Sequence, residues 1–237
     1  MSMMICMLRS HVVTGAGRGV GRAIADRLLR NGDAVVVLEL DPTEVAWIPD
    51  HPAGTRITAV IGSASDLATV ERAADAAEQT GPLSGWVNNA AVFHDAALHT
   101  DSPDDIVGLI NANLQPALVG SAVAARRFRA AQTGGAIVNV SSHQVQRAVR
   151  GALPYAVAKA AIEGLTKGAA VDYDARWPRS TRSAASGSPR KWLTPSPTCC
   201  PMPIPSSAEP WSPSTADEQP AAKTRKRGRQ IRPMPSA

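Results

Sequence analysis

Cysteine is scarce in this chain, since Cys6, Cys199 and Cys200 are the only three among 237 residues. Three cysteines at these positions make neither a disulfide framework nor the paired spacing of a zinc site. No histidine, cysteine and aspartate set has metal-ligand spacing, so we predict no metal. A chain so poor in cysteine fits a reducing compartment, and we expect a cytoplasmic protein.

Long hydrophobic runs are missing as well. The Met-rich start holds one arginine, Arg9, and no extended apolar stretch, which argues against a signal peptide. No segment approaches the roughly 18 consecutive apolar residues of a membrane helix, so we expect no membrane partner. Hydrophobic residues still make up 44% of the chain, which is ample for one α/β domain.

Acidic residues are rare in one part of the chain only. Residues 1–177 hold 15 Lys/Arg and 17 Asp/Glu, whereas residues 178–237 hold 10 and 3. The second part also contains 12 of the 19 prolines and shows no apolar periodicity. We therefore predict one domain over 1–177 and a disordered, basic Pro/Ser/Arg-rich tail over 178–237. Attachment of this tail to nucleic acid or membrane is an alternative, although we expect no nucleic-acid partner.

Strands and helices alternate through the first part of the chain. Apolar runs and helical periodicity predict strands at 9–14, 34–40, 57–62, 83–87 and 136–140, and helices at 20–29, 67–79, 103–131 and 155–172, the third broken or bent near Pro116. The Val-rich run Ala34–Leu40 is typical of a strand buried on both faces. The alternation predicts an α/β fold with a Rossmann-type, doubly wound parallel sheet.

A glycine-rich turn joins the first strand to the first helix. The segment Thr14–Gly21 reads T-G-A-G-R-G-V-G. Glycine allows tight turns, and without Cβ atoms a pyrophosphate can approach the N–H groups at the helix N-terminus. An ordinary Gly-rich turn is the alternative interpretation, and the strand–turn–helix context disfavours it.

The spacing T-G-x-x-x-G-x-G resembles the short-chain dehydrogenase/reductase family, and the resemblance covers residues 9–175. Asn88–Ala91 is similar to the family's N-N-A-G, and Tyr155–Lys159 has its Y-x-x-x-K pattern. The resemblance implies an NAD(P)-dependent oxidoreductase that acts on a small-molecule alcohol or ketone. The cofactor contacts it implies are Gly15, Arg18, Gly19, Val20, Gly21, Glu39, Asn89, Ala90, Tyr155 and Lys159.

Tyr155 and Lys159 lie one helical turn apart and share a face of the helix. A phenol with a pKa of about 10 is a poor base, but a neighbouring ammonium favours the phenolate and lowers that pKa. Tyr155 can then exchange a proton with a substrate oxygen. The resemblance adds Ser142, which hydrogen-bonds the substrate oxygen, and Asn113, which holds a water behind the lysine. The predicted catalytic residues are thus Asn113, Ser142, Tyr155 and Lys159.

The choice between NAD and NADP depends on two charged residues. Glu39 ends the second strand, 18 residues after Gly21. A carboxylate there accepts hydrogen bonds from the ribose hydroxyls and repels a 2′-phosphate. Arg18 argues the other way, because a basic residue in the glycine loop holds that phosphate in some family members. We predict NAD in preference to NADP.

Elements that the resemblance implies after the Tyr155 helix, including two further strands, are not visible in the sequence. We hypothesise a reading-frame shift just after Tyr173, because a shifted frame over Pro210–Asp217 permits V-V-T-V-D-G-G, similar to the family's last strand. Sequencing the gene across these codons tests this. The alternative function is then a truncated, inactive nucleotide-binding protein. We also expect a homodimer through the long helices that hold Asn113 and Tyr155, as the resemblance implies.

Overall fold

The computed structural model describes residues 8–173, and within them five parallel strands form one sheet. The strands are β1 (Ser10–Thr14), β2 (Ala34–Glu39), β3 (Ile57–Ile61), β4 (Leu83–Asn88) and β5 (Ala136–Asn139), in the spatial order β3-β2-β1-β4-β5. The predicted doubly wound parallel sheet is confirmed. The predicted tail, the absent last strands and the frame shift concern residues outside the described part.

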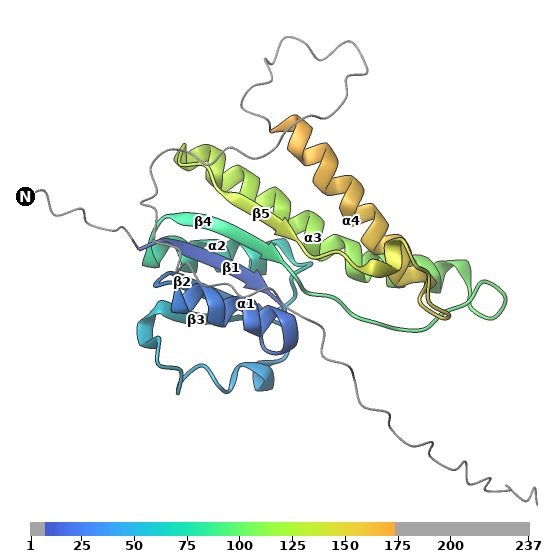
Figure 1. The fold of residues 1–237 in the computed structure, drawn as a ribbon, viewed down its shortest axis with the longest axis horizontal. Coiled ribbons are helices and arrows are strands. Elements are labelled where there is room, and N and C mark those ends of the chain that lie inside the picture. The colour runs from blue at the N-terminus through green and yellow to red at the C-terminus, as the bar shows by residue number, and fades with distance from the viewer. Residues whose placement is uncertain (1–7, 174–237) are drawn as a thin grey trace, which may run out of the picture. The chain divides into compact units, whose positions relative to one another are not determined.

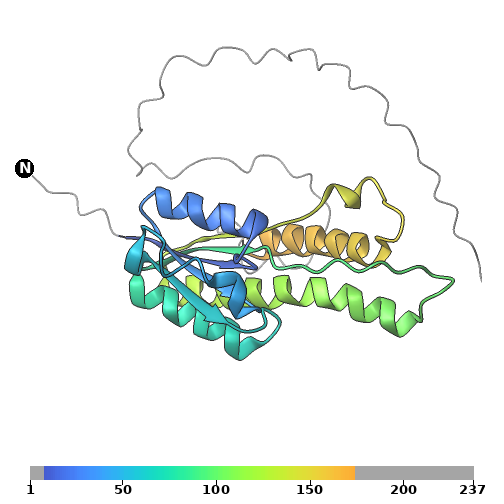
Figure 2. The ribbon, with the colours of Figure 1, turned by 90° about the horizontal axis from the view of Figure 1, so that it is seen from below.

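Four helices and three short 3-10 turns connect the strands. They are α1 (Gly19–Arg30), α2 (Leu67–Thr80), α3 (Pro103–Ala131) and α4 (Leu153–Asp172), with η1 (Pro42–Val45), η2 (Gly54–Arg56) and η3 (His143–Val145). Figure 1 shows α3 and α4 side by side at the β5 end of the sheet. Figure 2 shows that α1 covers one face of the sheet, while α2 and α3 cover the other.

The central strands carry apolar side chains toward both helical layers. Val12 and Val36 pack with residues of α2 and α3, whereas the alternate residues Val13 and Val37 pack against α1. All four are almost completely buried. Successive strand residues point to opposite faces, so a strand covered on both sides must be apolar throughout. This explains the uninterrupted Val-rich run in β2.

The helix boundaries follow local sequence signals. The Asp66 carboxylate accepts a hydrogen bond from the Thr69 N–H at 3.0 Å, which caps α2. Helix α1 ends at Arg30, and Gly32 follows it with a φ of +91°. Helix α3 continues through Pro116, so the predicted break there is absent.

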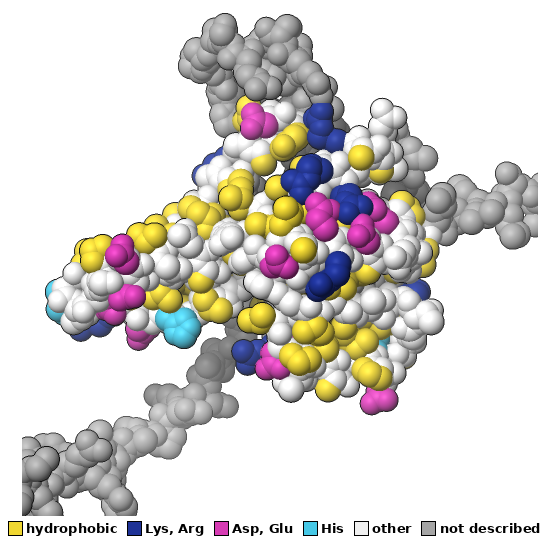
Figure 3. Space-filling view, turned by 180° about the vertical axis from the view of Figure 1, so that it is seen from behind, with side chains coloured by type: hydrophobic (Ala, Val, Ile, Leu, Met, Phe, Trp, Pro, Cys, Tyr) yellow, Lys and Arg dark blue, Asp and Glu magenta, His cyan; other side chains and the backbone are white. Residues whose placement is uncertain are grey.

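Helix α3 is long and apolar enough, by length and composition, to cross a membrane, the one such helix in the described residues. Core helices of globular domains pass the same test. Val123 and Ala124 of α3 are fully buried in the core cluster that joins the sheet to α2 and α3. Arg127 of α3 also forms ion pairs with Glu71, Asp75 and Glu78 of α2. Figure 3 shows acidic and basic side chains close together on this face. Such packing is typical of a core helix.

Strand β5 is less covered than its neighbours. In the described part of the chain it pairs with β4 alone, and Val138 at its centre is 51% exposed. A groove of about 660 Å³ runs beside it, between the C-terminal halves of α3 and α4. Its lining includes Ser121, Phe128, Ile137, Asn139, Thr166 and Tyr173.

Candidate nucleotide and catalytic site

The glycine loop between β1 and α1 adopts a conformation that requires glycine. Gly15 and Gly19 have φ angles of +62° and +56°, in the left-handed region. A Cβ atom at Gly15 would lie 2.8 Å from the Cα of Ala90, and one at Gly21 would overlap the carbonyl oxygen of Gly15. The loop is therefore folded tightly onto the segment that follows β4.

The N-terminus of α1 has the properties of an anion site. Arg18 occupies the N-cap position without a side-chain hydrogen bond, and the first turn contains no acidic residue. A Cβ atom at Gly19 would meet nothing within 4 Å, so the space in front of the loop is open. The first N–H groups of a helix lack intrahelical partners and attract negative charge. A dinucleotide pyrophosphate fits this end of the helix, beside the exposed Val20.

Asn89 and Ala90 hold the glycine loop in place. Their backbone N–H groups both donate to the Thr14 hydroxyl at 3.0 Å, and the Asn89 side-chain amide donates to the Gly15 carbonyl at 2.9 Å. These bonds bring the ends of β1 and β4 together at the carboxyl edge of the sheet, where ligands bind in open α/β folds. Contact of either residue with a cofactor stays a prediction.

Glu39 also contacts the glycine loop. Its carboxylate accepts hydrogen bonds from the N–H groups of Gly17 and Leu40, each at 2.9 Å. Arg18 points to a second carboxylate, because its Nε lies 3.6 Å from Oε1 of Glu44. The loop therefore faces two acidic side chains, of which the sequence pattern identified only Glu39.

Lys159 is buried at the end of β5, although it stands on the helix α4. Its side chain is only 2% exposed, and its Nζ donates to the Val140 carbonyl at 2.7 Å. Burial lowers the pKa of the Lys159 ammonium below its usual value. The Nζ lies 5.5 Å from the centre of the Tyr155 ring. The spacing of four residues thus brings the predicted ammonium and phenol onto one face of α4.

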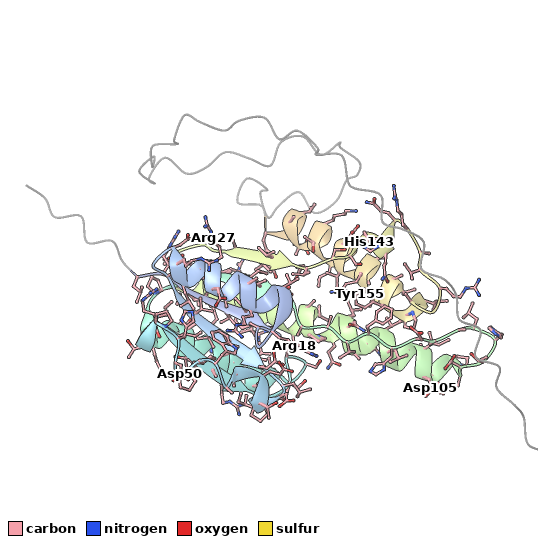
Figure 4. All side chains as sticks on the ribbon, turned by 60° about the horizontal axis from the view of Figure 1, so that its bottom comes forward. Arg18, Arg27, Asp50, Asp105, His143 and Tyr155 are labelled. Atoms are coloured by element: carbon pink, nitrogen blue, oxygen red, sulfur yellow. The ribbon has the colours of Figure 1, made fainter. Side chains whose placement is uncertain are left out.

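Tyr155 is half-buried and packs against the loop after β4. Its ring meets that of Phe93 edge to face, with centroids 5.3 Å apart. The same loop is tied to the start of α4 by the Ala96 N–H, which donates to the Gly151 carbonyl at 2.9 Å. Figure 4 labels Tyr155 near the start of α4 and Arg18 at the start of α1.

Ser142 lies three residues beyond β5 and begins η3, which contacts α4. Its hydroxyl oxygen accepts a hydrogen bond from the Gln144 N–H at 3.2 Å. That bond uses an oxygen lone pair and leaves the hydroxyl proton available to donate. Donation to a substrate oxygen stays a prediction for Ser142.

Asn113 is buried on α3, but its direct contacts are with the protein chain. Its side-chain oxygen accepts from the Val92 N–H at 2.9 Å, and its amide donates to the Leu109 carbonyl at 3.0 Å. Asn113 therefore fixes the loop after β4 to α3. Asn111, the neighbouring asparagine, is exposed. The water-holding role of Asn113 stays a prediction.

A sequence profile described as short chain dehydrogenase matches residues 9–177. The chain belongs to the short-chain dehydrogenase family. Among family members, the 3beta-hydroxysteroid dehydrogenase 2 of Eggerthella lenta is 31% identical over 169 residues, which cover 70% of this chain and 65% of that protein. The gluconate 5-dehydrogenase of Gluconobacter oxydans is 32% identical, with coverage of 68% and 64%.

A solved structure of the short-chain dehydrogenase fold is similar as well. It is a protein of Agrobacterium tumefaciens assigned as a gluconate dehydrogenase, with a TM-score of 0.63 and 30% sequence identity. The match covers 70% of this chain and 66% of that one. The chain spans about 65% of the length of the first relatives it matches. The predicted family and fold are confirmed, and members of this family use NAD(H) or NADP(H).

Three residues around the candidate site are not indicated by any sequence pattern. They are Glu44 and Trp47, which contact the glycine loop from the β2–β3 connection, and Phe93, which packs on Tyr155. No spacing rule identifies Glu44 or Phe93. No spacing rule identifies Trp47 either, because it lies eight residues beyond the end of β2.

Proposed function

We propose that this chain is an NAD-dependent oxidoreductase that transfers a hydride between the nicotinamide and a carbonyl or secondary alcohol. The observation that carries the proposal is the buried Lys159 ammonium 5.5 Å from the Tyr155 ring. A charged group is costly to bury, and its burial next to a phenol is typical of a tuned proton donor or acceptor. The names of the relatives, which include steroid and gluconate dehydrogenases, support the same reaction class.

The bound nicotinamide supplies the hydride acceptor or donor. The Tyr155 hydroxyl gives or takes the proton at the substrate oxygen, one helical turn from the buried Lys159. The Ser142 hydroxyl donates a hydrogen bond to the same substrate oxygen. These three residues form the proposed Ser-Tyr-Lys mechanism.

The remaining predicted site residues have supporting or binding roles in the proposal. Asn113, buried on α3, holds a water near the lysine. The cofactor contacts come from both ends of the site, with Tyr155 and Lys159 at the nicotinamide half and Gly15, Arg18, Gly19, Val20, Gly21, Glu39, Asn89 and Ala90 at the other.

The preference for NAD rests on Glu39. Its carboxylate is anchored by the Gly17 and Leu40 N–H groups at the end of β2. A carboxylate fixed there accepts hydrogen bonds from ribose hydroxyls and repels a 2′-phosphate.

We further propose a cytoplasmic homodimer that associates through α3 and α4. Leu118 of α3 and Val157 of α4 are large apolar residues that are about half exposed. Figure 3 shows hydrophobic side chains on the surface of the elongated end of the molecule, where these helices begin. Exposed apolar surface on paired helices favours association with a second copy. Size-exclusion chromatography with light scattering tests the dimer, and a monomeric mass contradicts it.

The test of function combines binding with turnover. Calorimetric titration of the full chain with NAD⁺ and NADP⁺ is expected to show binding, with NAD⁺ favoured by about tenfold because of the carboxylate charge. Nicotinamide absorbance is then followed with panels of secondary alcohols and ketones, including sugar acids and hydroxysteroids. Absence of binding for both nucleotides contradicts the proposal.

A second candidate is nucleotide binding without turnover. The observation that favours it is the open surface of β5, where Val138 is 51% exposed. This strand leads directly to Ser142, so an uncovered β5 leaves the substrate side of the site less enclosed. Tight NAD⁺ binding with no turnover across the whole panel supports this second candidate over the first.

A further inference from the structure

The connection after β2 packs directly on the glycine loop. A Cβ atom at Gly17 would lie 2.6 Å from Cβ of Glu44 and 3.0 Å from the Glu44 carbonyl oxygen. The turn η1 that carries Glu44 is itself capped, because Asp41 accepts from the Thr43 N–H at 2.8 Å. Glu44 therefore has a fixed backbone position beside the residue that precedes Arg18.

Arg18 and Glu44 form an ion pair at the surface of the loop. The Arg18 Nε lies 3.6 Å from Oε1 of Glu44, and the arginine side chain is 82% exposed. Arg18 is the cation in the glycine loop that could form an ion pair with a ribose 2′-phosphate. Its charge is instead shared with a carboxylate of the same protein, so less of it is available to a ligand.

A second arginine at this end of the site, Arg22, contacts an aromatic ring. The guanidinium of Arg22 stacks over the Trp47 ring, 4.3 Å from its centroid. The Trp47 indole N–H in turn donates to the Gly17 carbonyl at 2.9 Å. The Arg22 guanidinium therefore lies on an aromatic ring, whereas the carboxylates of Glu39 and Glu44 stand at the loop itself.

We propose that Glu44 is a second specificity-determining residue for the nucleotide, which excludes a 2′-phosphate by pairing with Arg18. The inference rests on the proposed nucleotide-binding function. Glu39 acts on the ribose hydroxyls themselves, whereas Glu44 acts on the cation that would otherwise accept the phosphate. Arg18 is thereby prevented from favouring NADP.

The test is the variant Glu44→Gln, which removes the charge and retains the shape of the side chain. Calorimetric titration of the full chain is expected to show NADP⁺ affinity raised about tenfold, with NAD⁺ affinity changed by about twofold or less. The double variant Arg18→Gln/Glu44→Gln is expected to lose the gain. Asp104→Asn, an equal charge change at the start of α3, is the control and should alter neither affinity.

The outcomes separate this inference from the proposed function. If the wild type binds NAD⁺ and Glu44→Gln gains no NADP⁺ affinity, the role of Glu44 is wrong and the proposed function stands. A gain that persists in the double variant also overturns it, because Arg18 is then not the phosphate partner. If no variant binds either nucleotide while thermal unfolding shows all of them folded, the proposed function fails and this inference fails with it.

Discussion

The two ends of the sheet differ in how completely they are covered. Around β1 and β2, helical layers close both faces, and residues such as Val36 are almost fully buried. At the other end, β5 has an exposed central residue, Val138, and an open groove between α3 and α4. Within the described residues, the β1–β2 part of the sheet is thus covered on both faces, whereas the β5 edge is only partly covered.

In the proposed function, this difference separates the residues that bind the cofactor from those that exchange the proton. The glycine loop depends on β1, on α1 and on Asn89 and Ala90, which contact it closely. Tyr155 and Lys159 depend on α4, which contacts the sheet through β5. Changes at the nucleotide end should therefore affect folding and cofactor binding together, while changes near β5 should affect turnover with little effect on stability.

The largest expected effect is at Tyr155. Replacing it with Phe removes the proton donor or acceptor and should lower kcat by about 1,000-fold, the typical contribution of a general acid or base. NAD⁺ affinity should change little. Steady-state kinetics and calorimetric titration check both parts. The matched control is Tyr173→Phe, since Tyr173 is the other tyrosine of the chain and is exposed. Equal rates for the two variants would contradict the assigned role of Tyr155.

Two helical glycines provide the next comparison. Gly21→Ala forces a Cβ atom into the Gly15 carbonyl and the Asn89 amide, and should lower the free energy of unfolding by about 3 kcal/mol. Gly164→Ala on α4 meets nothing within 4 Å and should raise it by about 0.5–1 kcal/mol through helix propensity. Urea unfolding measures both changes. A stable Gly21→Ala protein would mean that the loop is less tightly folded than described.

Two valines, Val36 in the buried strand β2 and Val138 in the exposed strand β5, should contribute differently to the free energy of unfolding. Val36→Ala in β2 leaves a cavity between helical layers and should cost about 2 kcal/mol. Val138→Ala in β5 removes a half-exposed side chain and should change the free energy of unfolding by less than about 0.5 kcal/mol. The two variants are compared by urea unfolding under identical conditions. Equal losses would show that β5 is covered in solution.

The smallest expected effect is the pH dependence from Lys159. Burial lowers its pKa, so below the ordinary lysine value of 10.5 the unfolded chain binds more protons than the folded one. The free energy of unfolding should then rise with pH as the solution approaches 10.5 from the folded-state pKa. In Lys159→Met this rise should disappear, which urea unfolding at a series of pH values measures. If the free energy of unfolding of the wild type instead falls over this pH range relative to the variant, folding does not lower the pKa of Lys159.

Much of the fold could be predicted from the sequence because its local signals agree with each other. The Val-rich run of β2, the cap at Asp66 and Gly32 after α1 each match the observed boundaries closely. The break predicted as one alternative at Pro116 is absent from α3. A proline removes one backbone donor, and packing of α3 against the sheet, α2 and α4 outweighs that loss.

The site was predictable only where a fixed spacing encodes it. Tyr155 and Lys159 share a helix face, so four residues of separation place them together. Glu44, Trp47 and Phe93 reach the site from irregular segments, and their positions depend on tertiary packing that no local pattern records. The contact of Asn113 with Val92 belongs to the same class.

Gly17 is held on both sides, with its N–H bonded to Glu39 and its carbonyl bonded to Trp47. Much of the entropy of ordering this turn is therefore lost during folding, before any nucleotide arrives. Because this turn is already ordered, fewer loop residues have to be ordered when the nucleotide binds. Nucleotide binding should then carry a smaller unfavourable entropy in the wild type than in a Trp47→Phe variant, where one of the two restraints is gone.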